Sequence, residues 1–350
     1  MADASLIAHL LVQKYNFHTP YFRQEKEFDR QGFHLSRTNM ACWQFEVGEL
    51  LVRIRDAMWK DALRRSWIAM DGTGTTIRAE DKCRHAHVFV LVAPGDSVLF
   101  RCSPKYNSKV MIELFGACTG TFLVDASANH NILFGPGKGR EGGCWAHARR
   151  PFAAAFRAGE EAAVAPALQW IQKLFLIERD LTLRSPEERL RIRKEQSAPL
   201  VDEFFQWVDQ QIEVAPQESL LRKGLVYARN QREALHEFLR NGEIPISNNI
   251  SERELRAIVK GRINWLFHSS DEHADRACAV FSLIASCEMH GLDPELYLQE
   301  ILTVGPNYPV RDILDLSPKN WIATRQRLIA EGSLRYLDLA KFTEAELRSR

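Results

Sequence analysis

The sequence predicts an α/β protein in which a strand-rich segment lies between helical regions. Apolar residues recur at helical spacing over residues 5–66 and again from about 148 to 240. Residues 67–134 instead contain short apolar runs separated by turn residues, which is typical of strands. Three acidic residues stand within this pattern, two after apolar runs, where we expect strands to end, and one at the start of a helical segment: Asp71, Asp125 and Glu252.

The composition is that of a globular protein with more than one packed unit. The chain has 350 residues, of which 45% are hydrophobic, enough for a sizeable core. Its 46 basic and 45 acidic residues nearly cancel, so affinity for nucleic acid must come from local patches. Seven cysteines without a CxxC pair indicate reduced thiols and a cytoplasmic protein. No apolar run approaches the roughly 20 residues that span a bilayer, so we expect no membrane partner.

The first 66 residues read as helices, with one turn that has two interpretations. Leu6, Ile7, Leu10 and Leu11 share a helix face. Further on, residues 28–40 contain a glycine turn and then a serine that can cap a second helix. This segment fits a helix-turn-helix, and it fits an ordinary helical hairpin at least as well.

The strand-rich segment predicts a hairpin, a helix and two further strands. Residues 87–92 and 98–102 flank a Pro-Gly-Asp-Ser turn. A helix is expected over 106–115, and the buried run 119–124 should form a strand that delivers Asp125. Asn131–Phe134 is a plausible next strand. Ribonuclease H-like folds have this order of elements: a strand with an acid, a hairpin, a helix and a second strand with an acid.

A helical block separates this segment from Glu252. Ser185-Pro186-Glu187-Glu188 has the Ser cap, first-turn proline and acids of a helix N-terminus. We therefore predict a ribonuclease H-like catalytic core with a large all-α insertion and helical N- and C-terminal extensions. The predicted boundaries are 1–66 for the N-terminal region, 67–147 and 246–300 for the two parts of the core, 148–245 for the insertion and 301–350 for the C-terminal extension.

Three carboxylates in this order suit a site for two Mg²⁺ ions, for which Mn²⁺ can substitute. Phosphodiester chemistry needs an activated oxygen nucleophile and relief of charge on the leaving oxygen, and two divalent ions supply both. Hard cations prefer carboxylate oxygens. A single Asp after a buried strand is more often a turn or cap residue than a ligand, but the joint order of the three acids favours the metal site.

Basic residues near these acids are candidates for binding DNA. On a helix, Glu252, Arg256 and Lys260 share one face, which could hold phosphates on either side of the cut. The structural alternative is a solvated face in which Glu252 pairs with Arg256. The candidate DNA-binding residues are Arg149, Arg150, Arg253, Arg256, Lys260 and Arg262.

Other residues are expected to support the site. Cys144 and His147 lie three residues apart, and two ligands do not make a structural zinc site. We interpret them as a packing or hydrogen-bonding pair that positions the acids, with a coincidental core pair as the alternative. Asn248 and Asn249 can cap the helix that carries Glu252. The apolar segment Trp265-Leu266-Phe267 is expected in the core rather than as a base-stacking platform.

At these residues the chain resembles the transposases of the insertion-sequence 66 family, which belong to the DDE group. The similarity runs from about Ser5 to Trp321, and its most specific motifs are residues 143–150, 248–256, 261–267 and 291–298. The resemblance implies that Asp71, Asp125 and Glu252 are the catalytic triad and that 148–245 is the helical insertion of the family. It also implies metal-dependent strand cleavage and transfer on DNA at the ends of an insertion sequence, self-association on DNA, and accessory proteins from the same element.

Departures from the family pattern keep other functions open. Gly72 stands where the family usually has Glu, and Ala126-Ser127 stands where it has Gly-Tyr. Family members usually begin with a coiled coil and a cysteine-rich, zinc-binding region, and we expect this chain to lack both. A degenerate or truncated remnant that only binds DNA or a partner transposase is therefore an alternative. A ribonuclease H-like repair nuclease fits the acids but not the longer motifs.

Overall fold

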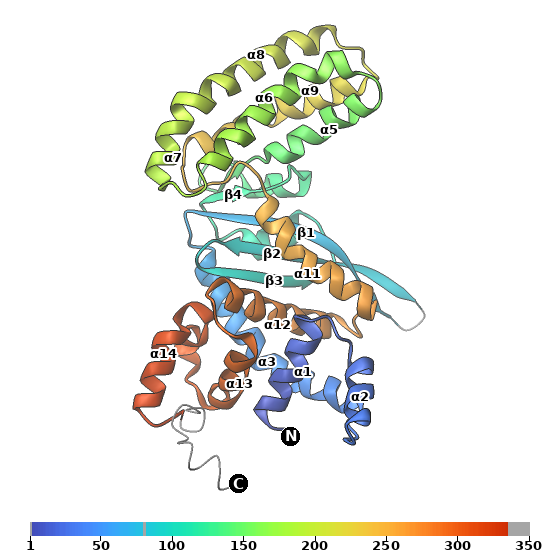
Figure 1. The fold of residues 1–350 in the computed structure, drawn as a ribbon, viewed down its shortest axis with the longest axis vertical. Coiled ribbons are helices and arrows are strands. Elements are labelled where there is room, and N and C mark those ends of the chain that lie inside the picture. The colour runs from blue at the N-terminus through green and yellow to red at the C-terminus, as the bar shows by residue number, and fades with distance from the viewer. Residues whose placement is uncertain (1, 80–81, 335–350) are drawn as a thin grey trace. The chain divides into compact units, whose positions relative to one another are not determined.

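The computed structural model describes residues 2–79 and 82–334 (Figure 1). The chain forms two compact units. The first unit comprises residues 1–62, 72–105 and 254–350, and the second comprises 63–71 and 106–253. The mixed α/β class predicted from the sequence is confirmed. Among the described residues, no helix has the length and apolar character needed to cross a membrane.

A five-stranded mixed sheet has the strand order β3-β2-β1-β4-β5. Strands β2 and β3 are antiparallel, whereas β4 runs parallel to both β1 and β5. In the second unit, Ile68 of β1 lies opposite Phe122 of β4, which in turn lies opposite Glu141 of β5. The strand bounds are Trp67–Arg78 for β1, Cys83–Ala93 for β2, Ser97–Ser103 for β3, Thr121–Leu123 for β4 and Arg140–Gly142 for β5.

The predicted hairpin is confirmed, and one predicted strand is wrong. His87 lies opposite Ser103, and the turn closes with a 2.9 Å hydrogen bond from the Asp96 N–H to the Ala93 carbonyl. Residues 131–134, expected as a strand, belong mostly to a 3-10 helix, η1 (Ala128–Leu133). The strand that pairs with β4 is the polar segment β5, because pairing with a buried neighbour can specify a short strand that has no apolar pattern of its own.

The first unit also contains the helices α1 (Ala4–Tyr15), α2 (Tyr21–Arg30), α3 (Arg37–Ala62), α12 (Asp271–Met289), α13 (Pro294–Val304) and α14 (Pro318–Ala330), with 3-10 turns at Gly305–Asn307 and Val310–Leu316. Helices α3 and α12 pack against β3 of the hairpin. The expected serine cap of α3 is confirmed, because Ser36 Oγ accepts the Asn39 N–H. Two helices joined by a short turn satisfy both interpretations of residues 28–40. Of the predicted C-terminal extension, residues 335–350 lie outside the described part of the chain.

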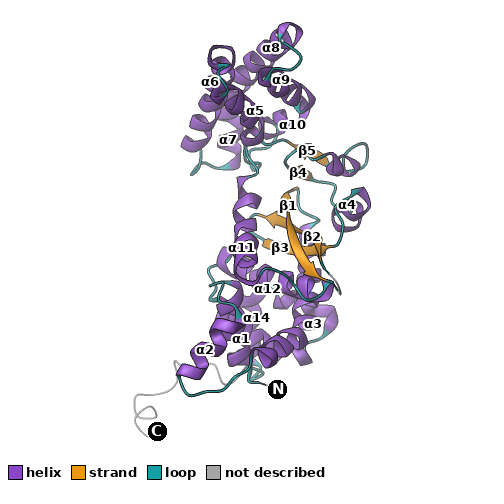
Figure 2. Cartoon of the chain, turned by 90° about the vertical axis from the view of Figure 1, so that its right-hand side faces the viewer, coloured by secondary structure: helices purple, strands orange, loops and turns teal. Residues whose placement is uncertain are grey.

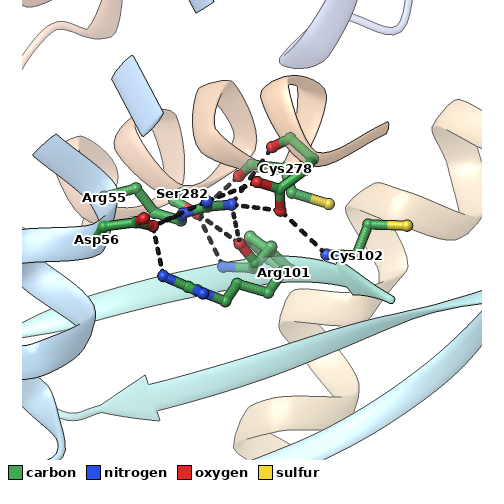
Figure 3. Close-up of polar contacts among 8 residues, drawn as sticks. Arg55, Asp56, Arg101, Cys102, Cys278 and Ser282 are labelled. Atoms are coloured by element: carbon green, nitrogen blue, oxygen red, sulfur yellow. Dashed lines mark hydrogen bonds and ion pairs between the residues drawn. The ribbon is translucent and has the colours of Figure 1, made fainter. Parts of the chain in front are cut away.

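A buried ion network ties α3, α12 and β3 together (Figure 3). The guanidinium of Arg55 is 1% exposed and donates two 2.7 Å hydrogen bonds to the carboxylate of Asp275. It also contacts Asp56, which accepts a hydrogen bond from Arg101 on β3. Ser282 Oγ accepts the Phe100 N–H at 2.8 Å, which fixes α12 against the strand. Paired donors and acceptors of this kind make the burial of a charge tolerable.

The second unit contains an all-helical bundle beside the parallel strands. Figure 2 shows α5, α6, α8 and α9 packed along one another, and their core includes Trp145, Phe152 and Phe204. The predicted helix start at Ser185 is confirmed as a capping box with Glu188. The helices of this unit are α4 (Ser108–Phe115), α5 (Trp145–Arg157), α6 (Glu161–Asp180), α7 (Pro186–Ile192), α8 (Ala198–Val214), α9 (Leu220–Asn230) and α10 (Arg232–His236), with a π-helical segment at Arg193–Ser197 and a 3-10 turn at Glu237–Leu239. Helix α11 (Asn249–Trp265) begins in this unit and continues in the first.

Candidate active site

Asp71 lies within β1 and not at its end. The strand continues from the buried residues 67–70 through Asp71 to Arg78, so the expectation that Asp71 ends a strand is wrong. Beyond Asp71, β1 continues because it pairs with a neighbouring strand of the sheet. The short apolar run gave no sign of this longer strand. Next to Asp71, the carbonyl of Met70 accepts a hydrogen bond from Asn248 Nδ2 at 3.1 Å. This bond fixes β1 relative to the segment that leads into α11.

Asp125 follows β4, accepts one hydrogen bond and has a histidine beside it. Its Oδ1 accepts the Ser127 N–H at 3.2 Å, and His130 Nδ1 lies 3.6 Å from the same oxygen. His130 is buried, and its Nε2 lies 2.7 Å from the Tyr106 hydroxyl. Burial lowers the pKa of His130, and the charge of Asp125 opposes this shift. A neutral His130 that accepts the Tyr106 O–H directs its Nδ1–H towards Asp125.

The residue after Asp125 has a strained backbone. Ala126 has a φ of 66°, a left-handed conformation in which a Cβ is crowded and which costs an L-residue roughly 1–2 kcal/mol. Glycine adopts this conformation without that cost. The turn that presents Asp125 therefore carries a residue that its geometry disfavours.

We expect Ala126→Gly to increase the free energy of unfolding by roughly 1 kcal/mol. The relief of strain exceeds the extra entropy that glycine loses on folding, because the native φ is positive. Urea denaturation followed by circular dichroism measures the change. Ala154→Gly, the same substitution inside α5, is the matched control and should destabilise by about 1 kcal/mol. A loss of stability in Ala126→Gly would contradict the strain.

Glu252 lies in the first turn of α11 and contacts α5. Its Oε1 accepts a 2.6 Å hydrogen bond from Arg150 Nη2 and lies 3.5 Å from His147 Nε2. The ion pair that the sequence suggested as an alternative, between Glu252 and Arg256, is not the one formed. Burial lowers the pKa of His147, the positive charge of Arg150 lowers it further, and Glu252 and Asp125 oppose both effects.

Electrostatic contacts connect the three acids in pairs. Burial raises the pKa of Tyr106, and the charges of Asp125 and Asp71 raise it further. His147 experiences the charges of Asp125 and Glu252 in the same way. The described residues contain no group of three or more His, Cys, Asp or Glu side chains placed to hold a metal ion. All three acids belong to the second unit.

Cys144 and Asn248 support the backbone around Glu252. Cys144 is buried directly before α5, and its Sγ accepts the Asn248 N–H at 3.2 Å. Asn248 is fully buried and accepts a hydrogen bond from the Ser251 hydroxyl through its side chain. With the Met70 contact, these bonds link β1, α5 and α11 at one point. Asn249 is the first residue of α11.

The candidate DNA-binding residues fall into two groups. Arg149, Arg150 and Arg253 belong to the second unit with the three acids, and all are exposed. In the first unit, the C-terminal part of α11 carries Arg256 and Lys260, which are also exposed. Arg262 donates to the Gly74 carbonyl of β1, so it has a structural partner within its own unit.

Three residues near Asp125 were not predicted as site residues from the sequence. Tyr106 and His130 form a pair beside it, and Glu141 of β5 is a further acid whose pKa is raised by burial. His130 follows the second acid by five residues, which is a weak signal, and nothing local marks Tyr106 or Glu141. They come near Asp125 only in the folded unit, where η1 packs against α4 and β5 pairs with β4.

Comparison with known proteins gives relatives for most of the chain. The chain is 27% identical over 348 residues to the uncharacterized protein y4hP of Sinorhizobium fredii, with 91% of the chain aligned, and 26% identical over 334 residues to y4qI of the same organism, with 90% aligned. It spans 62% of the length of each of these two relatives.

A family model gives the assignment. Residues 1–276 match the model described as Transposase IS66 family. This range includes all three acids, the Cys144–His147 pair and the whole of α11. The match covers well over half of the 350 residues, and the chain therefore belongs to the IS66 family of transposases.

Proposed function

We propose that this chain is a DDE-type polynucleotidyl transferase that cleaves DNA at the ends of an insertion sequence and joins it to a target. Asp71, Asp125 and Glu252 are the catalytic acids in this proposal. The observation that carries it is that one compact unit contains all three acids, within the residues that match the transposase family model. Self-association on DNA and accessory proteins from the same element remain predictions.

The strand arrangement supports the proposed catalytic core. The order β3-β2-β1-β4-β5, with an antiparallel hairpin on one side and parallel pairs on the other, agrees with the ribonuclease H-like sheet that the sequence predicts. Asp71 lies on the central strand, and Asp125 follows the neighbouring strand. In this arrangement the second unit contributes all three acids.

The chemistry of the donor set fits two Mg²⁺ ions, with Mn²⁺ as a substitute. All three side chains offer carboxylate oxygens, the ligands that these hard cations prefer. Bound divalent ions activate the attacking oxygen and offset charge on the leaving oxygen. Glu252 accepts a hydrogen bond from Arg150. To bind a cation, the Glu252 carboxylate must give up this hydrogen bond. The Ser127 N–H donates to the carboxylate of Asp125, and His130 lies beside it.

A second candidate function is binding without catalysis, by a remnant of such an enzyme. Two observations favour it. Arg150 already donates a hydrogen bond to the carboxylate of Glu252, and Ala126, directly after Asp125, has a strained left-handed backbone. In this case the basic residues still contact DNA or a partner transposase. The two candidates differ in whether the chain binds divalent ions.

A metal titration with a joining assay separates these candidates. For a metal-binding enzyme we expect the Tm to rise with Mg²⁺ or Mn²⁺ concentration, because a ligand that binds only the folded state stabilises it. NaCl at matched ionic strength is the control. The same metals should support nicking or joining of duplexes from the DNA that flanks the gene. A Tm independent of both metals, with no cleavage, would assign the chain to the remnant.

A further inference from the structure

The end of α11 presents apolar side chains to solvent. The sequence predicts Trp265-Leu266-Phe267 in the core, and this is only partly right. Trp265 packs against Tyr15 at 5.7 Å and Phe281 at 6.3 Å between ring centroids. Leu266, however, is 65% exposed and Phe267 is 42% exposed. Apolar side chains that remain in water forgo about 25 cal/mol per Å² of burial, so their exposure requires a reason.

Aromatic contacts before this segment and hydrogen bonds after it hold it in its exposed position. Before it, Trp265 is anchored in the aromatic cluster. After it, the His268 N–H donates to the Thr76 carbonyl at 3.0 Å, and the His268 carbonyl accepts the Arg78 N–H at 2.8 Å. Both partners lie on β1, in the same unit as the segment. Leu266 and Phe267 are therefore displayed between two fixed points and do not hang from a free loop.

Leu266 also has a strained backbone. Its φ of 61° is left-handed, which costs a residue with a Cβ roughly 1–2 kcal/mol. Its N–H donates to the Arg262 carbonyl, and the Phe267 N–H donates to the Trp265 carbonyl at 2.7 Å. Strain of this kind persists where the surrounding structure imposes it, and it concentrates at binding and catalytic sites.

The exposed face of α11 that leads to this segment carries positive charge. Arg256, Lys260 and Ile263 are spaced four and three residues apart on α11, so they share the helix face that is exposed. Ile263 is 72% exposed. Within the described part of the chain, neither Arg256 nor Lys260 forms an ion pair. A row of cations that ends in exposed apolar groups is complementary to a polyanion that also offers apolar surface.

DNA has both properties, since its bases are apolar on their faces. Cations contact the phosphates, whereas Leu and Phe side chains have no favourable contact there. Apolar wedges of these types enter between base pairs and unstack them, or pack on bases that have left the stack. We propose that Leu266 and Phe267 form such a wedge, inserted against unstacked bases, while Arg256 and Lys260 hold neighbouring phosphates. The inference rests on the proposed function, which makes DNA the substrate.

Fluorescence of 2-aminopurine tests the wedge. The full chain is bound at saturation to short duplexes tiled across the DNA that flanks the gene, each with one adenine replaced by 2-aminopurine. We expect the wild type to increase the fluorescence at one or two adjacent positions, because unstacking relieves quenching. Leu266→Ala and Phe267→Ala should each lose most of this increase. Leu266→Met, which keeps a long apolar side chain, should retain it.

Controls separate the wedge from general binding. Val310→Ala alters an equally exposed apolar residue of the same unit and should change nothing. Lys260→Ala should lower the salt dependence of binding by about one charge but keep the fluorescence at saturation. Leu266→Ala should leave the salt dependence unchanged.

Three results would overturn the inference. The first is binding by the wild type without any increase in fluorescence, and the second is an increase that survives both alanine variants. The third is the conversion of a dimer to a monomer by these variants in sedimentation, which would make the segment a contact between copies. Absence of binding to any duplex would instead refute the proposed function itself, and the wedge with it.

Discussion

Asp125→Asn is expected to reduce metal-dependent cleavage of DNA by at least about a hundredfold, because a neutral amide removes several kcal/mol of charge stabilisation from a divalent ion. The amide is nearly isosteric and retains an oxygen that can accept the Ser127 N–H. The fold and the Tm without metal should therefore remain close to wild type. Gel assays of nicking and joining with Mg²⁺ measure the loss, and the Tm rise with Mn²⁺ should weaken in parallel.

Asp202→Asn is the matched control for this variant. Asp202 lies on the exposed surface of α8 in the same unit, and its substitution makes the same change in charge. Cleavage by Asp202→Asn should equal that of the wild type. If Asp125→Asn cleaved at the wild-type rate, Asp125 would not be a catalytic acid, and the proposed triad would be wrong.

Asp275→Ala is expected to lower the free energy of unfolding of the first unit by about 3 kcal/mol. Loss of one partner leaves the other charge buried, and breaking buried pairs typically costs about 3–5 kcal/mol. Arg55 keeps Asp56 as a partner, and the Asp275 side chain is 33% exposed, so the lower end of this range applies. Calorimetry measures the shift, because the two units need not unfold in one transition.

Two further variants sharpen this test. Asp312→Ala removes a more exposed acid of the same unit, which within the described residues pairs only with its neighbour Arg311, and should change stability by less than about 0.5 kcal/mol. The double variant Arg55→Met with Asp275→Leu removes both charges and should recover part of the loss, since apolar side chains often replace a buried pair well. Equal stability of Asp275→Ala and wild type would show that the network contributes nothing.

Two parts of the fold with a clear local signal were predicted correctly. The β2–β3 hairpin is predictable because apolar runs flank a turn that contains Gly95, and the start of α7 is predictable because Ser185 and Glu188 form a capping box. The parts that depend on distant partners were not. β5 is polar and three residues long, and its pairing with β4 makes it a strand. Asp71 appeared to end a strand because the apolar run stops there, although β1 continues to Arg78.

The same distinction applies to the candidate site. The acids and the Cys144–His147 pair stand in recognisable motifs, so the sequence could suggest them. Tyr106 and His130 are 24 positions apart, and Arg150 and Glu252 are 102 positions apart. No local sequence pattern indicates either contact. For Leu266, an apolar triplet gives no indication of which side chain is anchored and which is exposed. That depends on the aromatic cluster around Trp265 and on the hydrogen bonds of His268.

The buried hydrogen bond between Asn248 and Met70 joins residues 178 positions apart. Protein synthesis proceeds from the N-terminus, and the intervening helices can fold as soon as they emerge. The contact that brings α11 to β1 can therefore form only after residue 248 has left the ribosome, and Glu252 follows four residues later. A nascent chain that ends within the helical bundle has Asp71 and Asp125 without the third acid. The order of the acids along the chain thus delays completion of the proposed nuclease centre until most of the protein has been made.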